Sequence, residues 1–471
     1  MTLGKKTKIV CTIGPSSEKH EVLLKMVEAG MNVMRLNFSH GSFDEHQQRV
    51  DDIRSIMEKT GKTVAILQDL GGPKIRIGTF KDKIVNLQEG HTFTLTTDQI
   101  EGTHEKVTVN YPELPKEVKV GTFIMVQDGT RKLQVTEVKG NDIITKVIIG
   151  GRISNHKGVN VPGAHLSVKS LTDKDKADLE FGLKNKVDFI ALSFVRKAED
   201  IVELREILKK NGSHAHIIAK IETPEALNNI DEILRDADGL MVARGDLAIE
   251  IPAEEVPLVQ KLLISKCNAA GKPVITATQM LESMVKNEVP TRAEVSDIAN
   301  AIIDGTDAIM LSEETTVGDF PIEAVQVMSK VAQRVESEVY TRNNIAEYDK
   351  SHGVTDVVSQ SAVRSAHAVG AKLIVALTRS GRTARMIARY RPAEPVLALS
   401  DVPENAHKLA LTFGCYPVVT PTFKTIDEIT SVIKHITLDN GLVTQGDKIV
   451  IVAGMPFGSS SVTNFILVET L

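Results

Sequence analysis

The chain has 471 residues, of which 42% are hydrophobic and 25% are charged, a composition typical of a folded protein with about two to four domains. Its 56 basic and 61 acidic residues give a net charge of −5, so there is no basic footprint for nucleic acid. No apolar run approaches the roughly 20 residues of a membrane span, and no signal peptide precedes the first predicted strand. Three widely spaced cysteines fit a reducing compartment. We therefore expect a cytoplasmic protein with neither a membrane nor a nucleic-acid partner.

Short apolar runs alternate with amphipathic stretches through most of the chain. Thr291, followed three residues later by Glu294, gives one of these stretches a capping-box start. Eight strand–helix units with continuous apolar strands favour an α/β fold, a (β/α)₈ TIM barrel built from residues 1–70 and 170–345. The predicted strands are 8–14, 32–40, 63–70, 187–195, 216–222, 238–245, 273–280 and 306–314.

Two regions depart from this order. Residues 71–169 separate the third and fourth predicted strands and contain alternating β segments punctuated by glycine, which predicts an inserted all-β domain. Because the insertion follows the C-terminal end of a barrel strand, we expect it to hang over the barrel mouth as a lid. Residues 346–471 alternate helices with apolar runs, which predicts a separate C-terminal α/β domain.

Polar and charged side chains occur where the predicted barrel strands end. Ligands of TIM barrels bind at the carboxyl-terminal ends of the strands. Any one of these residues could be a structural ion pair or a polar strand end, but eight of them on five strands predict a functional site at one mouth. They are Arg35, Asn37, Ser39, Asp69, Lys220, Glu222, Asp246 and Thr278.

Two carboxylates of this set could bind a divalent cation. Mg²⁺ typically takes one or two protein carboxylates and fills its shell with water and substrate oxygens, which Glu222 and Asp246 could satisfy. The alternative is two salt bridges, from Glu222 to Lys220 and from Asp246 to Arg244. We favour the metal, and with Lys220 and Arg35 beside it the pocket would suit an anionic, phosphorylated substrate.

Motifs spread over essentially the whole chain resemble those of one enzyme family. In this order and spacing, the chain contains segments similar to those of pyruvate kinase: MNVMRLNFSHG, GPKIR, NHKGVNVPG, AKIE, MVARGDL, ITATQMLESM, PTRAE and DGTDAIMLS. One such motif would be a weak signal, whereas this many separated matches are highly specific. The resemblance implies transfer of a phosphoryl group from phosphoenolpyruvate to ADP, giving pyruvate and ATP in the last step of glycolysis, usually in a homotetramer.

The resemblance also implies roles for the residues at the mouth. Arg35 would hold the transferred phosphoryl group, and Lys220 would stabilise the charge on the phosphoryl and enolate oxygens. Mg²⁺, or Mn²⁺ in its place, would be bound by Glu222 and Asp246. The backbone N–H groups of Gly245 and Asp246 would receive the substrate carboxylate.

Further implied roles concern proton transfer and the nucleotide. Thr278 would lie where the enolate carbon is protonated through water, and closure of the lid would exclude water from the phosphoryl group. The nucleotide would contact four residues, Asn37, His40, Arg76 and, from the lid, Lys157. Three positions depart from the common family pattern without an expected effect on catalysis, namely Ala248, Glu313 and Thr316.

A loop in the C-terminal region, TRSGRTA, could bind a phosphate. Its hydroxyls, an arginine and backbone N–H groups at a helix start form a plausible cradle, and the alternative is a polar helix cap. In the family the corresponding loop binds the phosphate of an allosteric effector, so the resemblance implies activation by a sugar phosphate or a nucleotide monophosphate. The residues are Thr378, Ser380, Gly381, Arg382 and Thr383.

One departure concerns a monovalent cation. Many members of the family that the chain resembles hold K⁺ with oxygens from the positions of Asn37, Ser39 and Asp69 and of the next residue, which is threonine in those members. They also have glutamate five positions after the aspartate. Here Leu70 takes the threonine position and Lys74 the glutamate position. Since the Lys74 ammonium carries the charge of K⁺ and needs no recruitment from solution, we expect no K⁺ requirement. The alternative is that Lys74 faces solvent and K⁺ still binds weakly.

Two other kinds of protein share some of these features. Carbon–carbon lyases and phosphoenolpyruvate mutases also use a Mg²⁺-dependent barrel, but they lack the β lid and the Lys157 motif. A non-enzymatic effector-binding protein would be expected to have lost Lys220, Glu222 or Asp246, and all three are present.

Overall fold

The computed structural model describes residues 3–164, 166–339, 353–423, 425–456 and 462–471. Eight strands, each parallel to its neighbours, close into a barrel in the order β1-β16-β15-β14-β13-β12-β3-β2. Each predicted barrel run contains one of them, so the predicted (β/α)₈ barrel is confirmed. The strands are β1 (Lys8–Thr12), β2 (Val33–Asn37), β3 (Ala65–Asp69), β12 (Phe189–Leu192), β13 (His216–Ile221), β14 (Gly239–Ala243), β15 (Val274–Ala277) and β16 (Ala308–Leu311).

The barrel strands are apolar throughout because both of their faces are buried. In β1, Val10 belongs to the cluster inside the barrel, whereas Ile9 and Cys11 belong to the layer beneath the helices. Thr291 caps α10 by accepting a hydrogen bond from the Glu294 backbone, as its pattern predicted. The helices of this part are α1 (His20–Ala29), α2 (Phe43–Thr60), α4 (Asp173–Lys184), α5 (Ala198–Lys210), α6 (Pro224–Asn228), α7 (Ile230–Asp236), α8 (Arg244–Glu250), α9 (Val256–Ala270), α10 (Arg292–Ile303), α11 (Glu313–Thr316) and α12 (Pro321–Val339).

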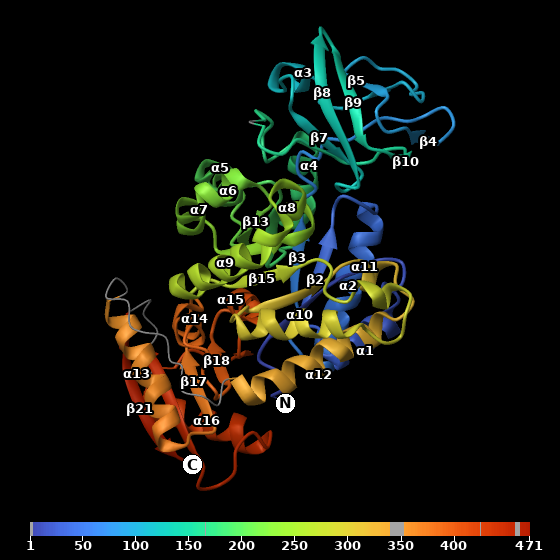
Figure 1. Ribbon diagram of the computed structural model, residues 1–471. Helices are drawn as coiled ribbons and strands as arrows, with labels where there is room; N and C mark the ends of the chain where they lie inside the picture. Colours follow the sequence, from blue (N-terminus) through green and yellow to red (C-terminus); the bar gives the residue numbers. More distant parts are fainter. Residues whose placement is uncertain (1–2, 165, 340–352, 424, 457–461) are drawn as a thin grey trace.

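The insertion after β3 is a curled β structure with its own hydrophobic core, as predicted. It has a six-stranded sheet in the order β11-β7-β8-β9-β5-β6 and a two-stranded sheet of β10 and β4. Figure 1 shows it as a separate body beyond the barrel end toward which β2 points. Its elements are β4 (Ile84–Leu87), β5 (Thr92–Thr96), β6 (Lys106–Thr108), α3 (Leu114–Glu117), β7 (Phe123–Val126), β8 (Arg131–Lys139), β9 (Asp142–Ile149), β10 (Gly151–Ser154) and β11 (Val159–Asn160).

The C-terminal part is the predicted α/β domain, with the strand order β19-β18-β17-β20-β21 and only β21 antiparallel to its neighbour among the described strands. The proposed boundary at 345/346 lies outside the described residues, and the boundaries at 70/71 and 169/170 stay predictions. The elements of the C-terminal domain are α13 (Gly353–Val369), β17 (Leu373–Leu377), α14 (Arg382–Ala388), β18 (Val396–Ser400), α15 (Pro403–Lys408), β19 (Cys415–Val419), α16 (Ile426–Asp439), β20 (Lys448–Gly454) and β21 (Thr463–Thr470).

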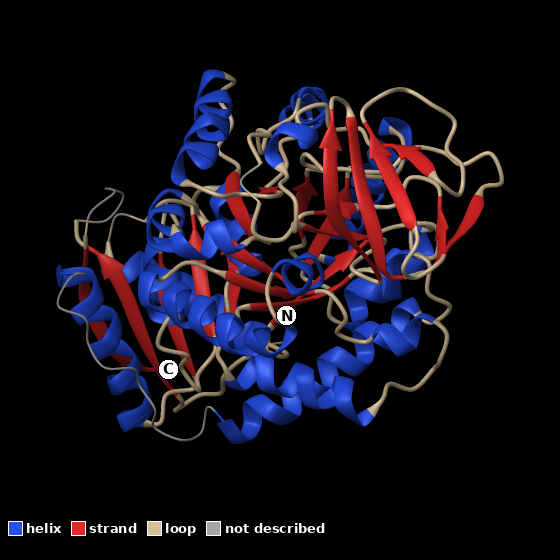
Figure 2. Cartoon of the chain, turned by 45° about the horizontal axis from the view of Figure 1, so that its top comes forward, coloured by secondary structure: helices blue, strands red, loops and turns tan. Residues whose placement is uncertain are grey.

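The start of the chain joins the barrel to this C-terminal domain. Figures 1 and 2 both show the C-terminal domain against the barrel, on the side away from the lid. The Lys8 ammonium donates to the carbonyl of Cys415, and the Tyr416 hydroxyl donates to the carbonyl of Gly4 at 2.6 Å. Within the described ranges, no helix has the length and apolar composition needed to cross a membrane.

Candidate active site

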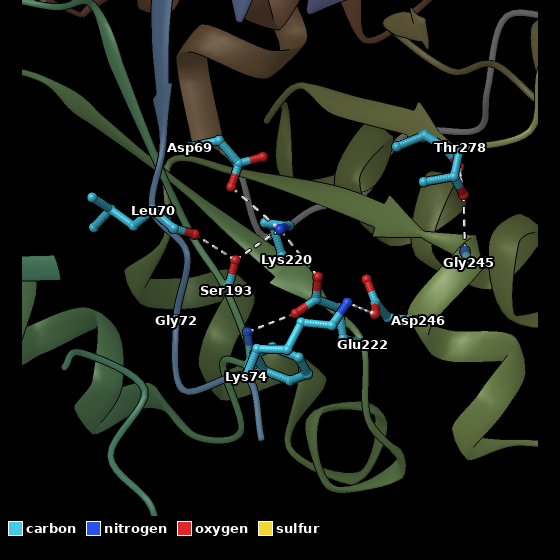
Figure 3. A network of polar contacts seen from close by, with 12 residues as sticks. Asp69, Leu70, Gly72, Lys74, Ser193, Lys220, Glu222, Gly245, Asp246 and Thr278 are labelled. Atoms are coloured by element: carbon cyan, nitrogen blue, oxygen red, sulfur yellow. Dashed lines mark hydrogen bonds and ion pairs between the residues drawn. The ribbon is translucent and has the colours of Figure 1, made fainter. Parts of the chain in front are cut away.

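Lys220, near the end of β13, is the centre of a charged network at the barrel mouth (Figure 3). Its ammonium lies 3.2 Å from Asp69 Oδ1 and 3.2 Å from Glu222 Oε1, and it donates to Ser193 Oγ at 2.7 Å. Burial disfavours this charge, but Asp69 and Glu222 outweigh burial and raise the pKa of Lys220 above its ordinary value. The ammonium is therefore fixed in place and charged at neutral pH.

Asp69, at the end of β3, holds a second cation. Arg35 Nε donates to Asp69 Oδ2 at 2.7 Å, and Arg35 Nη1 donates to Thr12 Oγ1 at 2.7 Å. Burial alone would raise the pKa of Asp69, but Lys220 and Arg35 together hold it below its ordinary value. One carboxylate thus orients both cations that the sequence assigned to the phosphoryl group.

Glu222 differs from Asp69 because one of its oxygens has an ion pair but no hydrogen bond. Oε2 accepts a hydrogen bond from the Phe194 backbone N–H at 2.7 Å. Oε1 lies beside Lys220 but has no hydrogen-bond partner, although Glu222 is only 1% exposed. Burial and the neighbouring charge of Asp246 raise the pKa of Glu222 despite Lys220. A buried carboxylate oxygen without a hydrogen bond fits a cation ligand.

Asp246, the second candidate ligand, lies in the first turn of α8, and its Oδ1 is 3.3 Å from the Lys74 ammonium. The alternative pairing with Arg244 is wrong, because Arg244 pairs with Asp297 at 2.8 Å. The other alternative, Glu222 with Lys220, is present. Where the chain is described, no group of three or more His, Cys, Asp or Glu side chains forms a metal cluster, and a two-carboxylate site of this kind fits Mg²⁺ completed by water and substrate oxygens.

Thr278 and Gly245 come together at the ends of β15 and β14. Thr278 has a left-handed φ of 70°, which is strained for a β-branched residue. Arg244 Nη2 donates to the Thr278 carbonyl at 2.6 Å, and the Gly245 N–H donates to Thr278 Oγ1 at 2.8 Å. A substrate carboxylate on Gly245 would therefore take over a bond that this N–H now makes to Thr278.

The four residues predicted to contact nucleotide lie on two bodies. Asn37 ends β2, where its Oδ1 accepts from the Ser39 N–H at 3.1 Å, and His40 follows in an exposed turn. Arg76 and Lys157 lie on the two passages of chain that connect barrel and lid, which meet in a β-bridge between Arg76 and Gly158. The nucleotide set is thus divided between the barrel and the lid hinge.

At the positions of the family K⁺ site, Asp69 is already bonded to cations of the protein, and Lys74 lies at Asp246 instead. The Leu70 side chain is buried in the barrel's outer hydrophobic layer, and its carbonyl accepts from Ser193 Oγ at 2.7 Å. Both oxygens of Asp69 are bonded to cations of the protein. The Lys74 ammonium lies against Asp246, the candidate Mg²⁺ ligand, and its side chain is 30% exposed.

Three groups of this network were missed in the sequence. Ser193 and Thr12 stand at the ends of β12 and β1 and orient Lys220 and Arg35. The strand-end rule that found the other residues would have found these two hydroxyls. The Phe194 N–H has no such signal, because its position depends on a left-handed φ of 53° after the strand.

The predicted effector loop is only partly available to a ligand. The Thr383 hydroxyl is buried 2.8 Å from that of Thr463, and Thr378 is buried as well. Ser380 Oγ accepts from the Arg382 N–H at 3.4 Å. Gly381 precedes α14 with a φ of 77° that favours glycine.

The exposed arginine of this loop, Arg382, borders a hollow with other basic side chains. Arg382 lines a hollow of about 220 Å³ between the C-terminal domain and the barrel, together with Arg385, Lys272 and His216. Asp238 lines the same hollow, so three cations face one carboxylate there, and the excess of positive charge favours an anion.

Comparisons with known proteins identify the family. Residues 4–325 match the family model described as pyruvate kinase, barrel domain, and residues 356–469 match pyruvate kinase, alpha/beta domain. A pyruvate kinase of Geobacillus stearothermophilus is 48% identical over 100% of this chain and 81% of its own length. One of Clostridium acetobutylicum is 43% identical over 99% of both chains.

The fold comparison gives the same result. The crystal structure of a pyruvate kinase from Cryptosporidium parvum superposes with a TM-score of 0.93 at 39% identity, covering 99% of this chain and 96% of that one. The chain therefore belongs to the pyruvate kinase family and transfers the phosphoryl group of phosphoenolpyruvate to ADP, giving pyruvate and ATP.

Proposed function

We propose that Arg35 and Lys220 hold the phosphoryl group as it passes from phosphoenolpyruvate to ADP. The observation that supports this most directly is the fixed Lys220 ammonium, held by Asp69, Glu222 and Ser193. Because its charge is already in place, no reorganisation is needed when charge develops on the phosphoryl and enolate oxygens.

Glu222 and Asp246 are the proposed ligands of Mg²⁺, or of Mn²⁺. Pyruvate kinases generally use divalent cations, and the open Glu222 oxygen beside Asp246 suits one. When bound, the cation supplies positive charge to the substrate carboxylate and phosphate. The two carboxylates that would hold it lie on the side of Lys220 away from Asp69 (Figure 3).

The Gly245 and Asp246 backbone N–H groups are proposed to bind the substrate carboxylate. Thr278 Oγ1, now bonded to the Gly245 N–H at 2.8 Å, would then be released at the place where the enolate carbon takes its proton, delivered through water. Asn37 and His40 from the barrel, with Arg76 and Lys157 from the lid hinge, would hold the nucleotide. Closure of the lid would keep water from the phosphoryl group.

The test of this assignment separates metal binding from catalysis. Glu222→Gln and Asp246→Asn should each weaken Mn²⁺ binding at least tenfold, measured by electron paramagnetic resonance without substrate. Both should also lower pyruvate formation in a coupled assay. Glu203→Gln, which changes an exposed carboxylate on α5, is the matched control. Unchanged Mn²⁺ binding in both site variants would refute the assignment.

We further propose that catalysis does not require K⁺. Leu70 offers no side-chain oxygen and Asp69 is already shared by two cations, so Asn37 and Ser39 are left with few partners for K⁺. Lys74 brings a tethered positive charge to Asp246 instead. Kinetics with Mg²⁺ in tetramethylammonium buffer should show activation by added K⁺ of less than about tenfold, and a larger activation would contradict the idea.

Regulation by a phosphorylated effector is also proposed. The ligand would use Ser380, Gly381 and Arg382 of the loop, with Arg385 and Lys272 across the basic hollow. The buried hydroxyls of Thr378 and Thr383 would shape the loop rather than touch the ligand. A panel of sugar phosphates and nucleoside monophosphates should shift the half-saturation for phosphoenolpyruvate and the melting temperature, and Arg382→Ala should remove both shifts. If no compound shifts either quantity, the idea fails.

The setting of the enzyme is part of the same proposal. We expect a cytoplasmic homotetramer whose partners are its substrates and effector, without nucleic acid or membrane. Sedimentation of the purified chain at micromolar concentration would test the tetramer.

A further inference from the structure

The short helix α8 connects the proposed metal ligand to the lid. Asp246 lies in its first turn and Glu250 is its last residue, four positions later and therefore on the same face. Asn160 of the lid strand β11 donates from Nδ2 to Glu250 Oε1 at 3.0 Å. Asn160 is only 9% exposed. One buried lid side chain is thus bonded to the helix that carries Asp246.

A second lid contact falls on the same turn of α8. A Cβ atom built on Gly129, in the turn between β7 and β8, would lie 3.5 Å from Ile249 Cγ1, so this turn of the lid packs on Ile249. Strands β7 and β11 are paired, with Val126 opposite Val159. The same corner of the lid therefore rests on the C-terminal end of α8 at two points.

The other end of α8 is attached to the barrel. Arg244 donates to the Thr278 carbonyl and pairs with Asp297 of α10, and the Gly245 N–H donates to Thr278 Oγ1. Asp246 follows directly after these two residues. The helix is therefore held by the barrel at its start and by the lid at its end, with Asp246 between the two attachments.

The lid attachment borders open space. Asn160 and Glu250 both line a cavity of about 490 Å³ between the lid hinge and the barrel, and Lys74, the partner of Asp246, lines it too. The hydrogen bond between lid and barrel therefore borders the same space as Lys74, the partner of Asp246.

We propose that Asn160 and Glu250 form a latch that couples the position of the lid to that of Asp246. Because Asp246 is the proposed metal ligand, the latch depends on the proposed function. Coupling is reciprocal, so a cation bound at Asp246 steadies the lid, and a settled lid steadies Asp246. Asn160 and Glu250 are positioning residues that act through α8 and need not touch substrate.

The experiment uses Mn²⁺ alone as the probe and amide hydrogen exchange as the readout. In the full-length wild type, Mn²⁺ should slow exchange both in α8 and in the lid around β11 and the β7–β8 turn. In Asn160→Ala this Mn²⁺-induced slowing of exchange in the lid, the lid effect, should disappear while Mn²⁺ still binds. Turnover should fall about tenfold, the scale of a lost hydrogen bond to a charged group.

Exchanging donor and acceptor distinguishes a latch from general destabilisation. Asn160→Asp faces Glu250 with a second carboxylate and should lose the lid effect. Adding Glu250→Gln restores a donor opposite an acceptor and should recover both the lid protection and turnover. Glu250→Gln alone keeps an acceptor and should stay close to wild type. Asn228→Ala, which changes another asparagine of the same cavity, is the matched control and should have no effect.

Two results would overturn the latch. The first is that Mn²⁺ slows amide exchange in the lid equally in Asn160→Ala and in wild type, or does not slow it in wild type at all. The other is failure of the double exchange to recover what Asn160→Asp loses. These results differ from failure of the proposed metal site, which would appear as Mn²⁺ binding that persists in Asp246→Asn.

Discussion

The two ends of the barrel both bury carboxylates, but the carboxylates differ in how many hydrogen bonds the protein gives them. At the end beside the C-terminal domain, Asp307 precedes β16 and is saturated by the protein. Its Oδ1 accepts from the Phe413 N–H at 2.9 Å and from Arg391 at 3.1 Å, and its Oδ2 accepts from Arg391 at 2.9 Å and from the Val274 N–H at 3.2 Å. At the mouth, Glu222 is as deeply buried, yet one of its oxygens has no hydrogen bond.

This difference separates a structural carboxylate from one kept for a ligand. A carboxylate with four protein donors has nothing left to offer, and breaking its ion pair leaves an uncompensated buried charge. A buried carboxylate oxygen that has an ion pair but no hydrogen bond still has lone pairs to offer, and a bound cation would stabilise it further. Changes at the mouth should therefore affect turnover before all else, whereas changes at the other end should affect stability and leave turnover nearly unchanged.

The largest effect is expected from Lys220→Met at the mouth. Removal of one preorganised donor typically costs about 10²–10³ in rate, and a full charge should cost more, so turnover should fall by at least about 10³. Asp69 keeps Arg35 and Glu222 keeps the Phe194 N–H, so the variant should stay folded, although two buried carboxylates lose a shared cation and its melting temperature should fall. A coupled assay with a thermal melt checks both points, and turnover within tenfold of wild type would refute the assigned role.

At the opposite end, Arg391→Met should leave the Asp307 carboxylate buried without its bidentate partner. Breaking a buried pair in this way costs about 3–5 kcal/mol of unfolding free energy, measured by urea denaturation. Turnover of the folded enzyme should stay within about twofold. Arg334→Met removes a surface pair with Glu338, whose partners are 71% and 62% exposed, and should cost below about 1 kcal/mol. A loss in Arg391→Met no larger than that in Arg334→Met would show that Asp307 does not depend on its buried ion pair.

The sequence predicted the elements of the fold better than their ends. The continuous apolar runs identified all eight barrel strands, because both faces of each strand are buried. The fourth was predicted to reach residue 195, but β12 ends at Leu192. The left-handed φ of Phe194 turns the chain out of the ladder, and an apolar residue type gives no sign of that conformation.

Site residues were predictable from strand ends, whereas their pairings were not. The rule that ligands bind at one end of a barrel located Lys220, Glu222 and Asp246. It could not show that Arg244 pairs with a residue 53 positions away, or that Lys74 pairs with one 172 positions away. Such pairs depend on how α10 and the lid hinge pack onto the barrel, which no local pattern specifies.

A smaller effect is expected when the Lys74 ammonium is replaced, so that the positive charge near the mouth has to come from K⁺ in solution. Lys74→Glu with Leu70→Thr restores the residue types of the K⁺-dependent family members and removes the ammonium beside Asp246. The variant should be activated more than about tenfold by K⁺ in tetramethylammonium buffer, because two unit charges about 4 Å apart interact by roughly 4 kcal/mol at an effective dielectric of 20.

The control for charge reversal is Lys286→Glu, at an exposed surface pair, which should leave the response to K⁺ unchanged. If the double variant shows no activation by K⁺, Lys74 does not substitute for the cation.

The smallest effect concerns His216 at the start of β13, on the side of the barrel that faces the C-terminal domain. Burial lowers the pKa of His216 to about 3, since it outweighs the attraction of Asp238, and Arg385 and Lys408 add to the shift. An unfolded histidine titrates near 6.5. The folded state therefore binds the proton less readily, and the stability contributed by neutral His216 is present above pH 6.5 and is lost as the pH falls toward 3. Between pH 7.5 and pH 5 this loss amounts to about 2 kcal/mol at 1.36 kcal/mol per pH unit.

The test is the variant His216→Gln, measured by urea denaturation at pH 7.5 and pH 5. Its loss of unfolding free energy over this range should be smaller than that of wild type by that amount, because the other titrating groups are common to both proteins. Its turnover at pH 7.5 should match wild type, as expected for a change at the saturated end of the barrel. Equal losses in the two proteins would show that folding does not lower the pKa of His216.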